Sequence, residues 1–162
     1  MLTQDCVREL FDYDPETGIV TRRVSRWPER WPVGGIVGTA RADGYLMTQI
    51  GATGYLLHRI IFLWMTGRMP LAVDHANMCR TDNRWQNIRE ATRSQNGANR
   101  RAISTNTSGY KGVSYHKRVG KYQARIYVEG KCIALGYRDT ALEAAELYNA
   151  ASAHHFGEFS RS

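Results

Sequence analysis

Apolar and polar positions change period several times along the chain, and each change predicts a secondary-structure element. The first 57 residues open with a short amphipathic segment, followed by β-prone runs that Pro- and Gly-rich turns separate. Residues 44–58 alternate apolar and polar positions across a glycine-rich turn, which is typical of a hairpin. Positions 60–65 are all apolar and Gly67 follows, so this segment predicts a buried helix that ends at the glycine.

The middle of the chain predicts a strand, a polar loop, a second strand and a short helix. The runs LAVD (71–74) and IREA (88–91) are the two β-prone segments, and we expect them to pair antiparallel. Thr92 and Gln95 have the spacing of a capping box, which predicts that the helix starts there and carries Asn96.

A compact second half follows a small, polar and basic linker. Three β-prone runs lie within residues 112–137, and Glu129-Gly130 predicts a tight turn between the last two. Thr140 and Glu143 form a second capping-box pattern, which opens an alanine-rich helix. Since small side chains let a helix pack closely on a sheet, we expect this helix to cover the apolar face of the sheet and to leave the other face open.

The positive charge of the chain is concentrated in the linker and in these three runs. The formal net charge is +7. Residues 98–138 hold nine Lys and Arg against one acid, whereas residues 1–97 hold 12 basic and 10 acidic residues. A field of one sign over an open sheet face is the footprint of a surface that binds phosphate. We therefore expect a phosphate-rich polyanion as the partner.

Cysteine usage and hydropathy indicate the cellular compartment. The cysteines at positions 6, 79 and 132 form no CxxC pair, so the sequence predicts neither a disulfide framework nor a zinc knuckle. No apolar run approaches the roughly 20 residues that cross a bilayer. The first residues, MLTQDCVRELFDYD, are acidic and mixed, unlike a signal peptide. We expect a cytoplasmic protein with no membrane partner and no organic cofactor.

Asp74, His75 and Asn96 carry the groups that hydrolysis of a phosphodiester needs. A histidine near its ordinary pKa is a suitable base at neutral pH. Mg²⁺ prefers oxygen ligands and keeps several waters, so one carboxylate and one amide form a minimal cage. Consecutive strand residues point to opposite sides, so Asp74 can face the metal while His75 faces the scissile group. Asn87, at the start of the second strand, is expected either to brace the loop or to orient His75.

Two other polar residues of this half have plainer interpretations. His58 begins the apolar helix and is expected to be a core or capping histidine. Asn83 lies in the long polar loop and is expected to form a turn.

These motifs resemble a known family. The segments LHRIIFLWMTGRMP and VDHANMCRTDNRWQNIREATRSQNGANR, within residues 55–101, resemble the HNH family of ββα-metal nucleases, in the version found in phage and mobile-intron homing endonucleases. The resemblance implies an endonuclease with one Mg²⁺, Mn²⁺ or other divalent cation per site, in a phage-infected bacterial host. It makes His75 the general base and makes Asp74 and Asn96 the metal ligands. Asn87 matches the middle asparagine of the motif, which steadies the loop at the catalytic site.

The second half resembles a DNA-binding domain. The segment SGYKGVSYHKRVGKYQARIYVEGKCIALGYRDTALEAAELYNAASAHHFGEFS, within residues 107–160, is similar to the APETALA2/ethylene-response-factor domain. That family lays a three-stranded sheet in the major groove of double-stranded DNA. The positions that match its DNA-facing places are Lys111, Ser114, His116, Arg125 and Tyr127. The basic pair Lys117 and Arg118 are further DNA-binding candidates. Arg93, at the expected helix start, is another candidate for contact with DNA at the scissile phosphate, or it only solvates the helix start.

Together these patterns predict an α+β protein with two modules. The first is an N-terminal ββα-metal HNH nuclease module, residues 1–97, whose core at about 71–101 is preceded by strands and a helix. A basic linker, residues 98–106, joins it to a C-terminal three-stranded antiparallel sheet packed on one helix, residues 107–162.

The predicted function is metal-dependent hydrolysis of phosphodiester bonds in duplex DNA, and the resemblance implies products with 5′ phosphate and 3′ hydroxyl ends. Deletion of residues 107–162 is expected to abolish duplex binding and to leave weak nicking. Two alternatives stay open: a non-catalytic DNA-binding regulator with a degenerate nuclease half, and a less selective phage nuclease. The sequence leaves the oligomeric state open, and with it the choice between a nick and a double-strand break.

Overall fold

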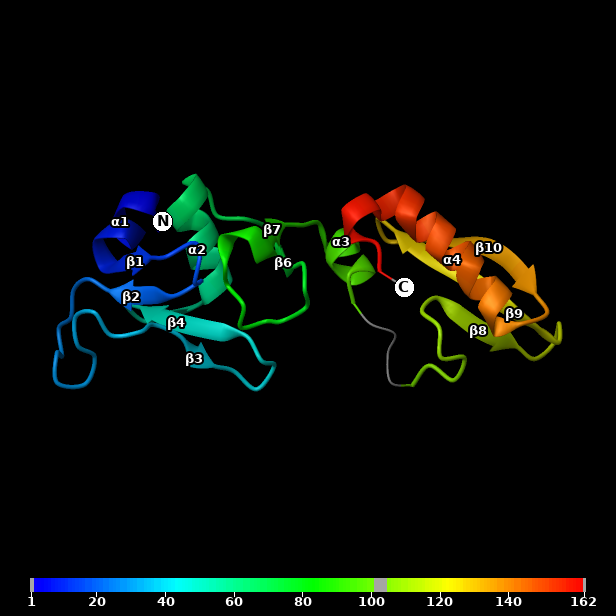
Figure 1. Cartoon of the computed structure of the whole chain (residues 1–162), viewed down its shortest axis with the longest axis horizontal. Coiled ribbons are helices and arrows are strands. Elements are labelled where there is room, and N and C mark those ends of the chain that lie inside the picture. The colour runs from blue at the N-terminus through cyan, green and yellow to red at the C-terminus, as the bar shows by residue number, and fades with distance from the viewer. Residues whose placement is uncertain (1, 101–104, 162) are drawn as a thin grey trace. The chain divides into compact units, whose positions relative to one another are not determined.

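The computed structural model describes residues 2–100 and 105–161. The chain divides into two compact units, Met1–Glu90 and Ala91–Ser162. Both combine helices with small antiparallel sheets (Figure 1). Residues 101–104 of the predicted linker lie outside the described residues.

The first unit runs from a short helix through a series of hairpins to a buried helix and a last hairpin. Its elements are α1 (Gln4–Leu10), β1 (Phe11–Tyr13), β2 (Val20–Arg22), β3 (Thr39–Ala40), β4 (Leu46–Ile50), β5 (Thr53–Leu56), α2 (Leu57–Thr66), β6 (Val73–His75), the 3-10 turn η1 (Trp85–Asn87) and β7 (Ile88–Glu90). Strand β1 pairs with β2, β4 lies between β3 and β5, and β6 pairs with β7, all antiparallel. Asp14 closes the β1–β2 turn by accepting hydrogen bonds from the backbone N–H groups of Glu16 and Thr17.

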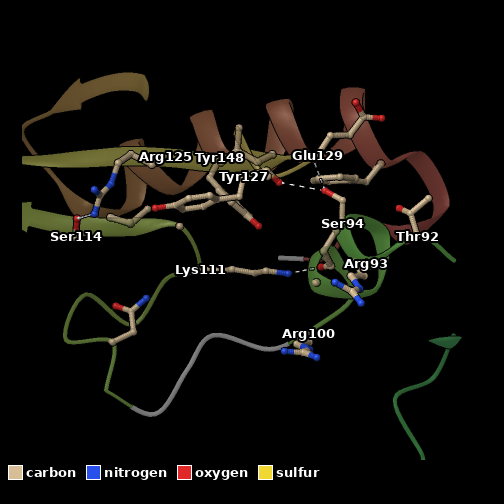
Figure 2. A pocket seen from close by; sticks show the side chains of 18 of the residues that line it. Thr92, Arg93, Ser94, Arg100, Lys111, Ser114, Arg125, Tyr127, Glu129 and Tyr148 are labelled. Atoms are coloured by element: carbon tan, nitrogen blue, oxygen red, sulfur yellow. Dashed lines mark hydrogen bonds between the residues drawn. The ribbon is translucent and has the colours of Figure 1, made fainter. Parts of the chain in front are cut away.

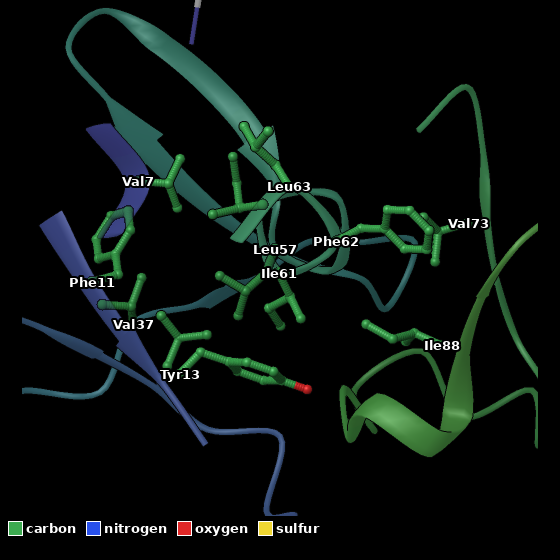
Figure 3. Packing of buried hydrophobic residues seen from close by; sticks show 12 residues of the cluster. Val7, Phe11, Tyr13, Val37, Leu57, Ile61, Phe62, Leu63, Val73 and Ile88 are labelled. Atoms are coloured by element: carbon green, nitrogen blue, oxygen red, sulfur yellow. The ribbon is translucent and has the colours of Figure 1, made fainter. Parts of the chain in front are cut away.

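Helix α2 lies at the centre of the first unit's core. It ends at Gly67, whose φ of 76° is the left-handed conformation that closes many helices. Its side chains pack with those of α1, β1 and the last hairpin (Figure 3). The buried apolar side chains of this core are Val7, Phe11, Tyr13, Val20, Val37, Leu57, Ile60, Ile61, Phe62, Leu63, Val73 and Ile88. Each fully buried aliphatic side chain contributes about 1.5–3 kcal/mol, so the core holds the β6–β7 hairpin firmly.

The second unit is a three-stranded sheet with one long helix on one face (Figure 1). Its elements are α3 (Arg93–Ala98), β8 (Val113–His116), β9 (Lys121–Val128), β10 (Lys131–Arg138), α4 (Ala141–Phe156) and the 3-10 turn η2 (Gly157–Phe159). Ala124 and Ile126 of β9 are buried against α4, whereas Arg125 and Tyr127 are exposed on the opposite face. This alternation follows from the two-residue period of a strand.

Several local predictions are confirmed. The hairpin expected within residues 44–58 is β4–β5, and the two runs on either side of the polar loop pair as β6 and β7. Both capping boxes form, at the starts of α3 and α4. The Glu129-Gly130 turn has φ values of 50° and 80°, the left-handed pair that a two-residue hairpin turn requires. The sequence motif places α3 in the nuclease module, whereas the structure groups α3 with the second unit.

Candidate active site

The β6–β7 hairpin places Asp74 and His75 side by side in a buried position. In the antiparallel register Asp74 lies opposite Arg89, and His75 lies opposite Ile88. Both Asp74 and His75 are only 4% exposed. Because Val73 and Ile88 belong to the hydrophobic core, the two polar side chains lie on a rigid element.

A hydrogen bond fixes the imidazole ring of His75. Its Nε2 lies 3.0 Å from Oδ1 of Asn83, and Asn83 is only 2% exposed. An amide oxygen only accepts, so Nε2 carries the proton and Nδ1 carries the lone pair. Burial lowers the pKa of His75, and the bond to Asn83 opposes that shift. The lowered pKa keeps the ring neutral at pH 7.

Asn87 braces the loop that follows β6. Its Oδ1 accepts from the backbone N–H of Asn77 at 3.0 Å, and its Nδ2 donates to the carbonyl of Asp82 at 2.7 Å. Arg84 adds a second brace by donating to the Asp82 carboxylate, and this contact holds the pKa of Asp82 well below its usual range. Of the two roles open for Asn87, the geometry matches bracing of the loop, and Asn83 makes the contact to His75.

The β1–β2 hairpin also supports the segment around Asn83. The Tyr13 hydroxyl donates to the carbonyl of Asn83 at 2.8 Å, and the backbone N–H of Trp85 donates to the carbonyl of Pro15 at 2.9 Å. Gly18 has a φ of 76°, and a Cβ on it would lie 2.5 Å from the backbone nitrogen of Arg84. A glycine is therefore needed where the two backbones meet.

Aromatic rings pack around His75. The ring of His58 lies 5.1 Å from that of His75 at an interplanar angle of 90°. The ring of Tyr45 lies 5.1 Å from His58 and 5.8 Å from His75. His58 is 3% exposed, so it lies in the core as predicted. It is not a satisfied core histidine, because within the described part of the chain its Nδ1 has no hydrogen-bond partner. These rings limit the orientations that the imidazole of His75 can adopt.

Acid should destabilise the first unit through His58. Burial, aided by the nearby His75 and Arg59, lowers the pKa of His58 from 6.5 to about 3. Below pH 6.5 the unfolded chain binds a proton that the folded His58 does not, so the free energy of unfolding falls with pH. From pH 7 to pH 5 we expect a loss of about 2 kcal/mol. Urea unfolding followed by tryptophan fluorescence measures it, since all four tryptophans belong to the first unit.

A matched pair of variants isolates this effect. His58→Phe removes the titrating group from the core and should lose most of the difference between pH 7 and pH 5. His154→Ala, on the exposed end of α4, should keep the whole difference. An unchanged difference in His58→Phe would contradict the assignment.

Asp74 is paired with Arg89 across the hairpin. Its Oδ2 accepts from Nε of Arg89 at 3.0 Å and from Nη2 at 2.9 Å. Asn96 lies in the second unit on α3, where its backbone N–H donates to the carbonyl of Thr92 at 3.0 Å. In residues 2–100 and 105–161 there is no group of three or more His, Cys, Asp and Glu side chains that could hold a metal. A carboxylate with an amide nevertheless fits Mg²⁺, which prefers oxygen donors and takes other ligands from water and substrate.

The uncovered face of the second unit carries a polar and aromatic surface. Nη2 of Arg125 lies 3.4 Å from Oγ of Ser114, and the ring of His116 packs edge-on to Tyr137 at 5.6 Å. Tyr127 is 62% exposed. We call this set the open sheet face; its members are Ser114, His116, Gln123, Arg125, Tyr127 and Tyr137.

The other predicted DNA contacts lie outside this face. Lys117 and Arg118 are exposed in the β8–β9 turn, and Arg93 is exposed in the first turn of α3. Lys111 is half-buried, and its ammonium donates to the carbonyl of Ala98 at the end of α3. The contact of Lys111 is therefore with the protein's own backbone.

Sequence reasoning missed two kinds of residue. Asn83 was expected to form a turn, because an asparagine in a polar loop usually does so. Its burial depends on Tyr13 and the β1–β2 hairpin, about 70 residues earlier, and no local signal shows that contact. Gln123 and Tyr137 could have been found, because strand alternation and the antiparallel register place them beside Arg125 and Ser114.

Comparison with known proteins matches the segment that contains Asp74, His75 and Asn96 to a nuclease family. A family model described as HNH endonuclease matches residues 55–98. The uncharacterized HNH endonuclease L560 of Acanthamoeba polyphaga mimivirus is 32% identical over 143 residues, which cover 81% of this chain and 69% of that protein. The chain belongs to the HNH endonuclease family.

One solved structure is similar over most of the chain. It is that of the HNH homing endonuclease I-HmuI, described as showing DNA binding and cleavage. The similarity has a TM-score of 0.41 and 19% identity, and it covers 85% of this chain and 76% of that chain. As a separate finding, none of the helices in the described ranges has the length and apolar character needed to cross a membrane.

Proposed function

We propose that this chain is a metal-dependent, homing-type DNA endonuclease whose second unit binds duplex DNA. The observation that carries the proposal is the geometry of the buried His75. Its Nε2 lies 3.0 Å from Oδ1 of Asn83, and it follows the buried Asp74 in the chain. Membership of the HNH endonuclease family supports the same conclusion.

His75 acts as the general base in this proposal. Its Nδ1 takes a proton from the water that attacks the scissile phosphate, while Nε2 keeps its bond to Asn83. That bond stabilises the imidazolium that forms, because the amide oxygen accepts from the same N–H throughout. The bracing contacts of Asn87 keep the loop that carries Asn83 in place.

Asp74 and Asn96 would hold the cation, Mg²⁺, Mn²⁺ or a similar ion. When bound, the cation supplies positive charge that stabilises the phosphate and the leaving 3′ oxygen. The oxygen donors of the two side chains support this assignment, and in the sequence only residues 91–95 separate β7 from Asn96. Arg89 balances the charge of the buried Asp74 carboxylate.

The open sheet face would contact DNA in the manner of APETALA2/ethylene-response-factor domains. Arg125 and His116 offer donors to base edges, and Lys117, Arg118 and Arg93 offer positive charge to phosphates. The excess of basic residues in this half of the chain supports the proposal.

Removal of divalent cations tests the proposed chemistry. Supercoiled plasmid should be cleaved with Mg²⁺ and stay intact with excess EDTA, and added Mg²⁺ should restore cleavage, because the reaction needs the cation's charge. A gel-mobility assay in EDTA should still show duplex binding. Undiminished cleavage in EDTA would disprove the metal-dependent mechanism. Ends mapped to one position would support a homing role, whereas a smear would favour a less selective nuclease.

A further inference from the structure

Helix α3, which carries Asn96, is too short to be stable alone. It has six residues, Arg93–Ala98, and one of them is Gly97. Isolated helices shorter than about 12–15 residues are marginal in water, and an interior glycine costs about 1 kcal/mol relative to alanine. The Thr92 capping box closes only the first turn. The remaining stability of α3 must come from packing.

The packing comes from the sheet, α4 and η2 of the same unit. Ala98, at the last position of α3, is 4% exposed and lies in one buried cluster with Ile126 of β9 and with residues of α4 and η2. The members of that cluster are Ala91, Ala98, Ile126, Tyr148, Phe156 and Phe159. The end of α3 is thus part of the core that joins the sheet to α4.

Polar contacts hold both ends of α3 (Figure 2). Near the start, Oγ of Ser94 accepts from the backbone N–H of Glu129 at 3.0 Å. The left-handed turn at Glu129 and Gly130 presents that N–H. At the other end, the ammonium of Lys111 donates to the carbonyl of Ala98, where a cation also complements the helix dipole.

Lys111 is suited to an internal contact. Burial, aided by Arg100 and Arg161, lowers its pKa to about 8. Its ammonium lies 6.0 Å from the ring centroid of Tyr148. A Cβ on Gly112, whose φ is 71°, would lie 2.1 Å from the Tyr148 ring, so glycine lets Tyr148 pack beside this lysine.

We propose that the sheet, α4 and η2 of the second unit are the structural support of the metal-binding helix α3, with Ser94 and Lys111 as positioning residues for Asn96. The inference rests on the proposed function, in which Asn96 is a metal ligand. It differs from the expectation that residues 107–162 form a removable targeting module, because deleting them would take away Ile126, Tyr148, Phe156 and Lys111 together. Cation affinity should then depend on residues 107–162, in addition to DNA affinity.

A double variant of the full chain, Ser94→Ala with Lys111→Met, tests this role. We expect amide exchange in residues 93–98 to accelerate at least tenfold while α4 stays protected, because the contacts at both ends of α3 are lost. The Mg²⁺ concentration for half-maximal cleavage should rise about tenfold, and Mn²⁺ binding measured by electron paramagnetic resonance should weaken to match.

Two control proteins separate the possible failures. Ser25→Ala with Lys131→Met changes the same residue types at a half-buried serine of the first unit and an exposed lysine of β10, and should match the wild type in α3 exchange and in Mn²⁺ binding. Asn96→Ala should weaken Mn²⁺ binding without faster exchange in α3; unchanged Mn²⁺ binding there would refute the ligand assignment in the proposed function. If Asn96→Ala weakens binding but the double variant binds Mn²⁺ like the wild type, or keeps α3 protected, the supporting role is overturned.

Discussion

His75→Ala is expected to lower the rate of DNA cleavage by about 10²–10⁴-fold, the usual contribution of a positioned general base. The side chain is 4% exposed and neutral, so its loss should leave duplex affinity in EDTA unchanged. The measurement is the single-turnover rate on supercoiled plasmid at saturating protein and Mg²⁺, with a gel-mobility assay run in parallel.

The matched control for this variant is His155→Ala. His155 lies in the last turn of α4 and is exposed, so its removal should change neither the rate nor the affinity. Thermal unfolding of both variants verifies that they are folded. If His75→Ala is folded and cleaves at the wild-type rate, His75 is not the base.

Much of the fold follows from local patterns. The α2 segment is continuously apolar and ends at a glycine with a φ of 76°, and both capping boxes appear as spaced pairs of residues. The β9 alternation between Ile126 and Arg125 shows which face α4 covers. These features are set by neighbours in the chain, where side-chain period and capping chemistry act directly.

The grouping of α3 did not follow from the sequence. Residues 71–98 form one continuous motif in the chain, so the sequence assigns α3 to the nuclease module. The structure groups α3 with the second unit because Ala98 is buried with Tyr148 and Phe156, about 50 residues later. Contacts across such separations depend on tertiary packing, which periodicity cannot report.

For the candidate site, too, the sequence predicts the local strand pairing but not the contacts between distant residues. Asp74 and His75 are neighbours on one strand, and the pairing of that strand with β7 follows from the two apolar runs. The partner of His75 was not predicted, because three asparagines follow it at positions 77, 83 and 87 and their residue type is identical. Tertiary contacts distinguish them: the β1–β2 hairpin approaches Asn83, whose side chain contacts His75, whereas the side chain of Asn87 binds backbone groups of the loop.

A single methyl group on Gly18 would disturb the contact between the β1–β2 hairpin and the Asn83 segment. In Gly18→Ala the new methyl would lie 2.5 Å from the backbone nitrogen of Arg84 and 2.6 Å from the carbonyl carbon of Asn83. Backbone atoms cannot turn away as a side chain can, so the Asn83 segment must shift or the hairpin must separate from it. Strain and overpacking together should lower the free energy of unfolding by about 2–5 kcal/mol. Cleavage at low temperature should fall at least tenfold, because the shift moves the bond that orients His75.

Gly51→Ala separates this effect from backbone strain. Gly51 has a φ of 60°, also in the left-handed region, but among the described residues no heavy atom beyond its chain neighbours lies within 4 Å of the position its Cβ would take. It should lose only about 1–2 kcal/mol and keep cleavage within about twofold of the wild type. Urea unfolding by tryptophan fluorescence and single-turnover cleavage at 10 °C measure both quantities in the two variants. Equal losses of cleavage in both would mean that the Gly18 contact does not position Asn83, and that His75 takes its orientation from the rings of His58 and Tyr45 instead.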